Sequence, residues 1–358
     1  MSYFDELDQE LRQLLAWADV RHEQGVPVKG KVNELKRLMA RTRRELEKAD
    51  VPKSLAEAEP NELQSIRDLR PRGPRVLWDD FPTGEYRERV RGAFLGRAAG
   101  CTLGAPVEGD SPETMASMAE LFGADFPPTD YWPAVTRHGV KRYGLDTHQM
   151  YTKPHMKYIP VDDDMTYTLL GLLILEEYGP DFSTAEVGKA WVKYVPQACT
   201  AEKVALENLK AGRSWKTVGS RNNPYMEWIG ADIRSDPWGY ACPGLPERAA
   251  EMAYRDAYLS HRFNGIYGEM YFSAVIAAAF AVDEPMEAIE LGLSEIPKTC
   301  RLYKDLKWAL RLAPKVTGYQ DAWDRVQTRF GPPKGCMSTV HTNNNACLTV
   351  WGVMLGGR

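Results

Sequence analysis

The 358-residue sequence has no apolar run of the roughly 18 to 20 residues that a membrane-spanning helix requires. Its N-terminus, MSYFDELDQELRQ, is charged where a secretory signal would be apolar. It also lacks a large excess of one charge, because 45 Lys and Arg residues face 49 Asp and Glu residues, for a net charge of -4. Such a balance does not attract nucleic acid or an anionic membrane. We therefore expect a cytoplasmic protein with no membrane partner and no sequence-specific nucleic-acid partner.

Several familiar motifs are missing as well. The six cysteines include no C-x-x-C pair, which argues against a zinc knuckle or a disulfide framework and favours reduced core thiols. No G-x-x-x-x-G-K-[ST] loop, no G-x-G-x-x-G turn after a strand and no G-x-S-x-G elbow is present. These absences disfavour a kinase, a dehydrogenase and a serine hydrolase.

The first 85 residues differ in composition from the rest of the chain. Residues 1 to 50 are highly charged, and leucines recur at helical spacing at Leu7, Leu11 and Leu14 and again from Val32 onward, which predicts two amphipathic helices around a turn at 25–30. Residues 51–80 hold four prolines among charges, which predicts a linker without regular structure. We predict a helical extension over 1–85 and a main domain over 86–358.

The main domain has helical periodicity almost throughout and little strand-like alternation, so an all-α fold is expected. The predicted helices cover residues 88–103, 163–178, 246–259, 269–282 and 342–355. Glycines recur at every fourth position at Gly92, Gly96, Gly100 and Gly104. Because each interior glycine costs a helix about 0.8 to 1.0 kcal/mol, we expect another helix to approach this face closely. The alanine-rich segment 273–280 is the expected neighbour.

The strongest chemical signal is Asp162-Asp163-Asp164, directly ahead of an apolar helix. One Asp would suffice to cap the helix, whereas three adjacent carboxylates repel one another unless a cation or strong donors lie nearby. Oxygen ligands of this kind suit magnesium, manganese or calcium. Glu108 follows a proline that ends the glycine-rich helix, so it lies on a turn, either as a metal ligand or base or as an ordinary surface residue.

Two further segments contain polar and aromatic groups suited to a nucleotide. The loop 260–269 includes His261, Asn264 and Gly265, which could contact a phosphate or a ribose; alternatively, Asn264 caps a helix and His261 bonds to a carbonyl. In the segment 222–234, Tyr225 and Trp228 could stack on a purine or fill a local core.

In this order, these segments resemble the ADP-ribosylglycohydrolase family, which includes the dinitrogenase reductase-activating glycohydrolases and the ADP-ribosyl-acceptor hydrolases. The similarity covers about residues 86 to 358. The matching segments are 91–109 (RGAFLGRAAGCTLGAPVEG), Asp162-Asp163-Asp164, 229–234 (IGADIR), 243–250 (PGLPERAA), 260–269 and 341–345 (HTNNN). The resemblance implies an orthogonal all-α domain that binds two Mg²⁺ or Mn²⁺ ions and ADP-ribose.

By this resemblance, Asp162 and Asp163 match the paired metal-ligating aspartates, and Glu108 matches the acidic residue of the first motif. Asp164 stands where the family commonly has threonine, so it is either a further ligand or turned away. After residues 341–355, family members continue into a Gly-x-Asp-Thr-Asp motif that completes the metal pair, whereas this chain ends at Gly356-Gly357-Arg358. We expect a truncated chain, or else a degenerate relative, in which half a metal site binds its ion weakly.

The predicted reaction is hydrolysis of a glycosidic bond that joins ADP-ribose to a protein or a small acceptor, with Glu108 and Asp163 as catalytic residues. Asp162, Asp163, Asp164 and Glu108 are the predicted metal ligands. The predicted substrate contacts are His261, Asn264, Gly265, Tyr225, Trp228 and Arg234. Two alternatives remain open: a non-catalytic protein that binds ADP-ribose or another nucleotide, and a protein whose residues 1–50 bind a partner or self-associate.

Overall fold

The computed structural model describes residues 4–78, 81, 83–135, 148–332, 335 and 337–356. The described residues form helices throughout and no strand; their one isolated β-bridge joins Trp228 and His341. The predicted all-α fold is therefore confirmed. The contacts divide the chain into two compact units, one of Met1–Glu57 with Gln327–Ser338 and the other of Ala58–Val326 with Thr339–Arg358. Among the described residues, no helix combines the length and apolar character needed to cross a bilayer.

The first unit contains the two long helices predicted at the N-terminus, α1 (Asp5–Glu23) and α2 (Lys29–Lys48). Gly25 lies in the turn between them with φ at 79°, a left-handed conformation that glycine adopts without steric cost. Neither helix buries a residue. The leucines of α1 are thus not part of a core.

The second unit contains the remaining helices. Their bounds are α4 (Leu63–Leu69), α5 (Thr83–Gly104), α6 (Pro112–Phe122), α7 (Asp163–Tyr178), α8 (Thr184–Tyr194), α9 (Thr200–Lys210), α10 (Trp215–Val218), α11 (Asp236–Ala241), α12 (Pro246–Ala257), α13 (Asn264–Ala279), α14 (Pro285–Gly292), α15 (Arg301–Leu312) and α17 (Thr342–Gly356). Two others, α3 (Lys53–Ala58) and α16 (Tyr319–Phe330), lie at the division between the units. All five predicted helices of the main domain are present, although α13 begins at Asn264, five residues before the predicted start.

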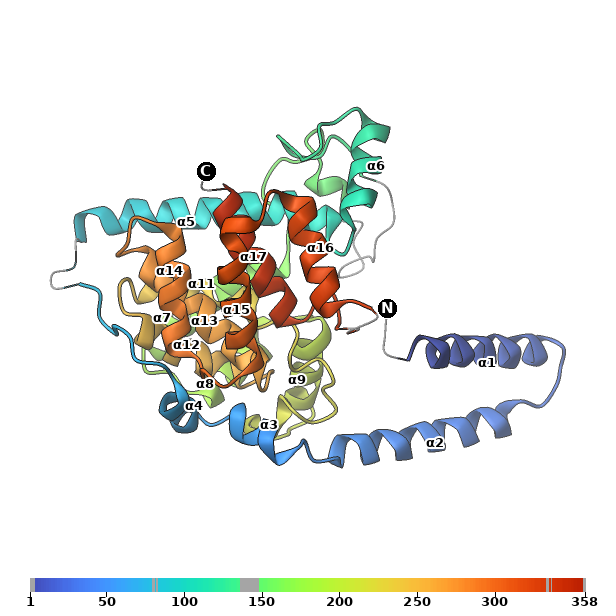
Figure 1. Cartoon of the computed structure of the whole chain (residues 1–358). Coiled ribbons are helices and arrows are strands. Elements are labelled where there is room, and N and C mark those ends of the chain that lie inside the picture. Colours follow the sequence, from blue (N-terminus) through green and yellow to red (C-terminus); the bar gives the residue numbers. More distant parts are fainter. Residues whose placement is uncertain are drawn as a thin grey trace. The chain divides into compact units, whose positions relative to one another are not determined.

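Helix α13 forms the centre of the core and contacts α11, α12, α14, α15 and α17 (Figure 1). Its sequence is apolar on all sides, and Ala274, Ala277 and Ala278 are fully buried. These small side chains let α11 approach closely: a Cβ on Gly239 of α11 would lie 2.5 Å from Ile276 Cγ2. The alanine-rich helix α13 therefore does pack closely against a glycine, but this glycine belongs to α11 and not to α5.

The glycine stripe of α5 does not have the neighbour that we predicted. A Cβ on Gly92, Gly96, Gly100 or Gly104 would meet no described heavy atom within 4 Å, and all four glycines are exposed. The opposite face of α5, with Ala98 and Cys101, packs against Met165 of α7. The prediction of a close helix contact at this stripe was wrong because α5 turns its larger side chains, not its glycines, toward the core.

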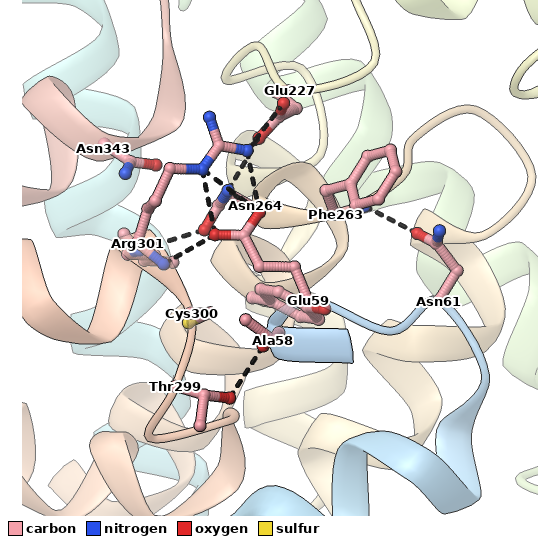
Figure 2. Close-up of polar contacts among 12 residues, drawn as sticks. Ala58, Glu59, Asn61, Glu227, Phe263, Asn264, Thr299, Cys300, Arg301 and Asn343 are labelled. Atoms are coloured by element: carbon pink, nitrogen blue, oxygen red, sulfur yellow. Dashed lines mark hydrogen bonds and ion pairs between the residues drawn. The ribbon is translucent and has the colours of Figure 1, made fainter. Parts of the chain in front are cut away.

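The predicted linker is corrected as well, because residues 58–69 are folded onto the second unit (Figure 2). Glu59 is 1% exposed and binds Arg301 with Oε2 to Nη2 at 2.7 Å, while the Ala58 carbonyl accepts from Thr299 and the Asn61 side chain accepts from the Phe263 amide. The four prolines lie before, between and after α3 and α4, so they do not interrupt either helix. Asp79 and Asp80, at the end of the predicted linker, lie outside the described residues.

Candidate metal centre

Asp162 is the N-cap of α7 and is only 1% exposed. Its Oδ1 accepts from the Asp164 amide at 3.2 Å, which satisfies one of the unpaired N–H groups at the beginning of a helix. Its Oδ2 accepts from the Tyr151 hydroxyl at 2.6 Å. Asp162 is thus the aspartate that caps the helix, and Tyr151 fixes the orientation of the same carboxylate.

Asp162 and Asp164 lie together with a thiol. One ligand atom from each of Cys101, Asp162 and Asp164 lies within 4.8 Å of the other two. Burial raises the pKa of the Cys101 thiol, and the charges of Asp162 and Asp164 raise it further. Cys101 therefore stays protonated at neutral pH, and the two carboxylates are the charged members of the group.

Arg97 lies one helical turn before Cys101 on α5 and faces the same region. Its Nη2 donates to the backbone carbonyls of Asp164 at 2.7 Å and of Ile233 at 2.6 Å, and its Nε forms an ion pair with Asp236 Oδ2 at 2.6 Å. The nearest approach of Nη2 to the Asp164 carboxylate is 3.7 Å. Arg97 thus mainly joins α5 to the beginning of α7 and to α11, and it compensates Asp236 more closely than Asp164.

The donor atoms fit a hard divalent cation. Asp162 and Asp164 supply carboxylate oxygens that Mg²⁺ and Mn²⁺ prefer, whereas a protonated thiol is a poor ligand for either ion. Asp164 keeps 31% of its side chain exposed, so a cation has access from solvent. Of the residues described here, Asp162 and Asp164 are therefore the ones that would hold the ion.

The other two predicted ligands lie outside this group. The Asp163 carboxylate accepts from the Asp164 amide at 3.2 Å and is half-buried. Glu108 follows the short 3-10 helix Ala105–Val107, on an exposed turn beside Gly109, where φ is 85°. The turn predicted from Pro106 is present; metal binding by Asp163 and by Glu108 stays a prediction.

A model of the ADP-ribosylglycohydrolase family matches residues 82–353, which include α5, the beginning of α7 and α17. The chain belongs to this family. Neither the curated proteins nor the solved structures that were searched contain a match. Membership in the family supports a glycohydrolase role. The cluster of Cys101, Asp162 and Asp164, called the acidic group below, agrees with the metal dependence typical of ADP-ribosylglycohydrolases.

Arg234, predicted to contact substrate, lies at the centre of a buried ion network. Its guanidinium pairs with Glu202 at 2.8 Å, Asp256 at 2.5 Å and Glu269 at 3.3 Å. The rings of Tyr167 and Trp191 lie 5.6 and 5.1 Å from it. Burial raises the pKa of Glu202 and of Glu269, and Arg234 counteracts this in both. In the described structure Arg234 therefore stabilises the core.

His261, Asn264 and Gly265 also have protein partners. His261 is fully buried with Nδ1 at 2.8 Å from the Ser260 hydroxyl, and burial lowers its pKa well below the usual value. Asn264 donates to Glu59 and Glu227 and accepts from the Leu302 amide (Figure 2). A Cβ on Gly265 would lie 2.3 Å from the Met226 carbonyl oxygen. These contacts hold the beginning of α13 in place, and ligand binding by the three residues stays a prediction.

Tyr225 and Trp228 pack against each other, with ring centroids 4.7 Å apart and planes at 60°. Both are half-buried, so part of each residue is accessible to solvent. The residues around the acidic group that the sequence analysis missed are Cys101, Arg97, Tyr151 and Asp236. Of these, Arg97 and Cys101 lie four residues apart in the first matching segment, a spacing that places them on one helix face.

Proposed function

We propose that this chain is a metal-dependent hydrolase that cleaves the N- or O-glycosidic bond between ADP-ribose and a modified protein or a small acceptor. The observation that supports this most is the pairing of the Asp162 and Asp164 carboxylates at the beginning of α7, inside the segment that matches the family. Two carboxylates held this close together repel each other, and a divalent cation bound between them would offset that repulsion.

The metal proposed for this site is Mg²⁺ or Mn²⁺, as one or two ions, with Asp162 and Asp164 as ligands and Asp163 and Glu108 as further candidates. When bound, such an ion orients the ribose hydroxyls and lowers the pKa of a coordinated water. Tyr151 and the Asp164 amide hold the Asp162 carboxylate in a fixed orientation. Arg97 keeps the ends of α5, α7 and α11 together and so limits movement of the ligands.

The proton transfer is assigned to Glu108, whose carboxylate lies on an exposed turn and can exchange protons with solvent. Asp163 would stabilise the oxocarbenium-like charge that develops on the anomeric carbon as the bond to the acceptor breaks. Tyr225 and Trp228 are the proposed adenine contacts, because both rings are still partly accessible.

Release of ADP-ribose from proteins modified on arginine and on serine tests the proposal, since these substrates offer an N-glycosidic and an O-glycosidic bond. We expect release with Mg²⁺ or Mn²⁺ and loss with a chelator. Calorimetric titration of the ion alone provides a readout that does not depend on turnover. Asp162→Asn, which keeps the helix cap, and Asp164→Asn are expected to weaken ion binding by at least about 10 to 100-fold.

Glu108→Gln separates proton transfer from metal binding. If Glu108 is the acid–base group, the rate falls by about 10² to 10⁴-fold while the affinity for the ion stays the same. Glu113→Gln, an exposed carboxylate on α6, is the matched control and leaves both unchanged. Ion binding unaffected by Asp162→Asn and Asp164→Asn would remove these residues from the site. ADP-ribose binding without turnover of either substrate would favour the non-catalytic alternative.

A further inference from the structure

The two helices of the first unit carry heptad stripes. In α1, Leu7, Leu11, Leu14 and Ala18 follow one another at intervals of four, three and four residues. In α2, Val28, Val32, Leu35 and Met39 repeat the same intervals from the N-cap onward. This spacing is typical of helices that pack side by side along their length.

The stripes are only partly covered. Leu7 is 53% exposed, Leu14 48% and Met39 43%, the other stripe residues are half-buried, and neither helix fully buries a residue. Large apolar side chains at flanking heptad positions widen both stripes: Leu15, Trp17 and Leu38 are each about half exposed. A seam this wide is typical of a multi-helix bundle, whereas a two-stranded coiled coil needs only the narrow stripe.

Within one chain, α1 and α2 form a groove near the turn. There, Ala18, Val28 and Val32 are half-buried and line a groove together with His22. Farther from the turn, Leu7, Leu14 and Met39 stay exposed. Single helices of about 20 residues are marginal in water, so the outer parts of α1 and α2 need a further surface to bury their stripes.

The two helices have opposite charge. Helix α1 has six acidic and two basic side chains, whereas α2 has eight basic and three acidic ones. The residues that flank the stripes follow the same pattern, with Asp8 and Glu10 on α1 and Lys31 and Lys36 on α2. Charges at these flanking positions determine which helices pair. An acidic stripe and a basic stripe in the same chain are complementary to a second copy of that chain.

We propose that two copies of this protein associate through their α1–α2 hairpins into a four-helix bundle in which α1 of each copy packs against α2 of the other. Pairing of α1 with the second α1 would bring acidic residues against acidic residues, and α2 with α2 would bring basic residues together. The crossed arrangement places Asp8 and Glu10 against Lys31 and Lys36 twice, once on each side of the bundle. It also covers Leu14 and Trp17 with Leu35 and Leu38 of the second copy.

Sedimentation velocity and light scattering of the full chain over a wide concentration range measure the association directly. The acid-reversed variant carries Asp8→Lys with Glu10→Lys, and the base-reversed variant carries Lys31→Glu with Lys36→Glu. We expect each variant alone to dissociate at concentrations at least about tenfold higher than the unmodified chain, because like charges then face each other. An equimolar mixture of the two variants is expected to form a heterodimer of the original strength.

The mixing experiment distinguishes pairing between copies from pairing within one chain, because a hairpin that closed on itself would not be restored by a second variant. Leu14→Lys is expected to abolish the dimer, whereas Leu121→Lys, at an exposed leucine of α6, is the control that keeps it. Circular dichroism verifies that α1 and α2 stay helical in each variant. A monomer at every concentration, or variants that fail to pair on mixing, would overturn the proposal.

Discussion

Around Arg234, the three buried carboxylates of Glu202, Asp256 and Glu269 share one guanidinium, whereas at the beginning of α7 the carboxylates of Asp162 and Asp164 lie beside a protonated thiol. The first group is almost completely buried, and its cation is part of the chain. In the second group, Arg97 Nη2 lies 3.7 Å from the Asp164 carboxylate and donates to backbone carbonyls.

The difference indicates which group holds the fold and which is available to a ligand. Carboxylates with an internal cation are compensated in every state of the folded protein, so they stabilise one arrangement of α9, α12 and α13. The adjacent carboxylates of Asp162 and Asp164 would gain further stabilisation from a bound divalent cation. Four experiments can test or refine this comparison.

The largest effect is expected for Arg234→Met. Removing the guanidinium leaves three buried carboxylates without their cation, at a cost of about 3–5 kcal/mol. Urea denaturation followed by circular dichroism measures this as a lower midpoint or as failure to fold. The control is Arg311→Met, at an exposed arginine of α15, which leaves the free energy of unfolding within about 0.5 kcal/mol. Equal midpoints for the two variants would contradict a structural role for Arg234.

The acidic group is expected to respond to the ion instead. Mg²⁺ or Mn²⁺ at about 100 times its dissociation constant should raise the free energy of unfolding by about 2.7 kcal/mol. Thermal or urea unfolding with and without the ion measures the increase. In Asp162→Asn the increase at the same ion concentration should fall to about 1.4 kcal/mol or less, whereas in Glu113→Gln it should persist. An undiminished increase in Asp162→Asn would place the ion elsewhere.

A smaller effect concerns His261, which lies next to the Arg234 network. Burial, and then the charges of Arg234 and Arg262, lower the pKa of His261 well below 6.5. The folded state thus binds fewer protons than the unfolded state, so stability is fully present above pH 6.5 and is lost as the pH falls below it. The loss amounts to at most about 1.4 kcal/mol per pH unit from this histidine. Burial also lowers the pKa of His341.

Denaturation midpoints over a pH series measure this dependence. His261→Phe should make the decline below pH 6.5 shallower, because the proton uptake of His261 on unfolding is gone. His22→Phe changes an exposed histidine of α1 and should leave the slope as it was. A slope that does not depend on His261 would mean that the imidazole is solvated in the folded state.

The smallest effect is expected on α5, the helix that contributes Arg97 and Cys101. Gly96→Ala should stabilise the protein by up to about 0.8 to 1.0 kcal/mol, because a Cβ at this position meets no described atom within 4 Å and alanine favours a helix. Thermal unfolding measures the change. Gly239→Ala on α11 is the contrasting variant and should destabilise by about 1–3 kcal/mol through overpacking. Destabilisation by Gly96→Ala would show that another surface covers the stripe.

The sequence was sufficient to predict the helices that carry the acidic group and the family. Helical periodicity placed α5, α7 and α17 closely, and the apolar run of α7 is too long for a typical strand. Asp162 could be predicted as a cap because a carboxylate ahead of an apolar helix has a local role that needs no tertiary information.

The remaining residues depend on contacts between distant segments. Tyr151 reaches Asp162 from a neighbouring loop, and Asp236 approaches Arg97 across 139 positions of sequence, with no local pattern that marks either one. Arg234 was predicted to bind substrate because it lies in a segment that matches the family; its three carboxylate partners come from three different helices. The glycine stripe gave the wrong neighbour because periodicity identifies a face of a helix and not what that face contacts.

The contact of Glu59 with Arg301 also bears on the synthesis of the chain, because 242 residues separate the two side chains. At translation rates of about 5–20 residues per second, Glu59 leaves the ribosome on the order of tens of seconds before its partner exists. During that interval residues 58–62 cannot dock, since Thr299 and the beginning of α13 are also unmade or only just made. Residues 58–62 are therefore synthesised early but are among the last to dock. They must stay solvated in the nascent protein until α15 emerges.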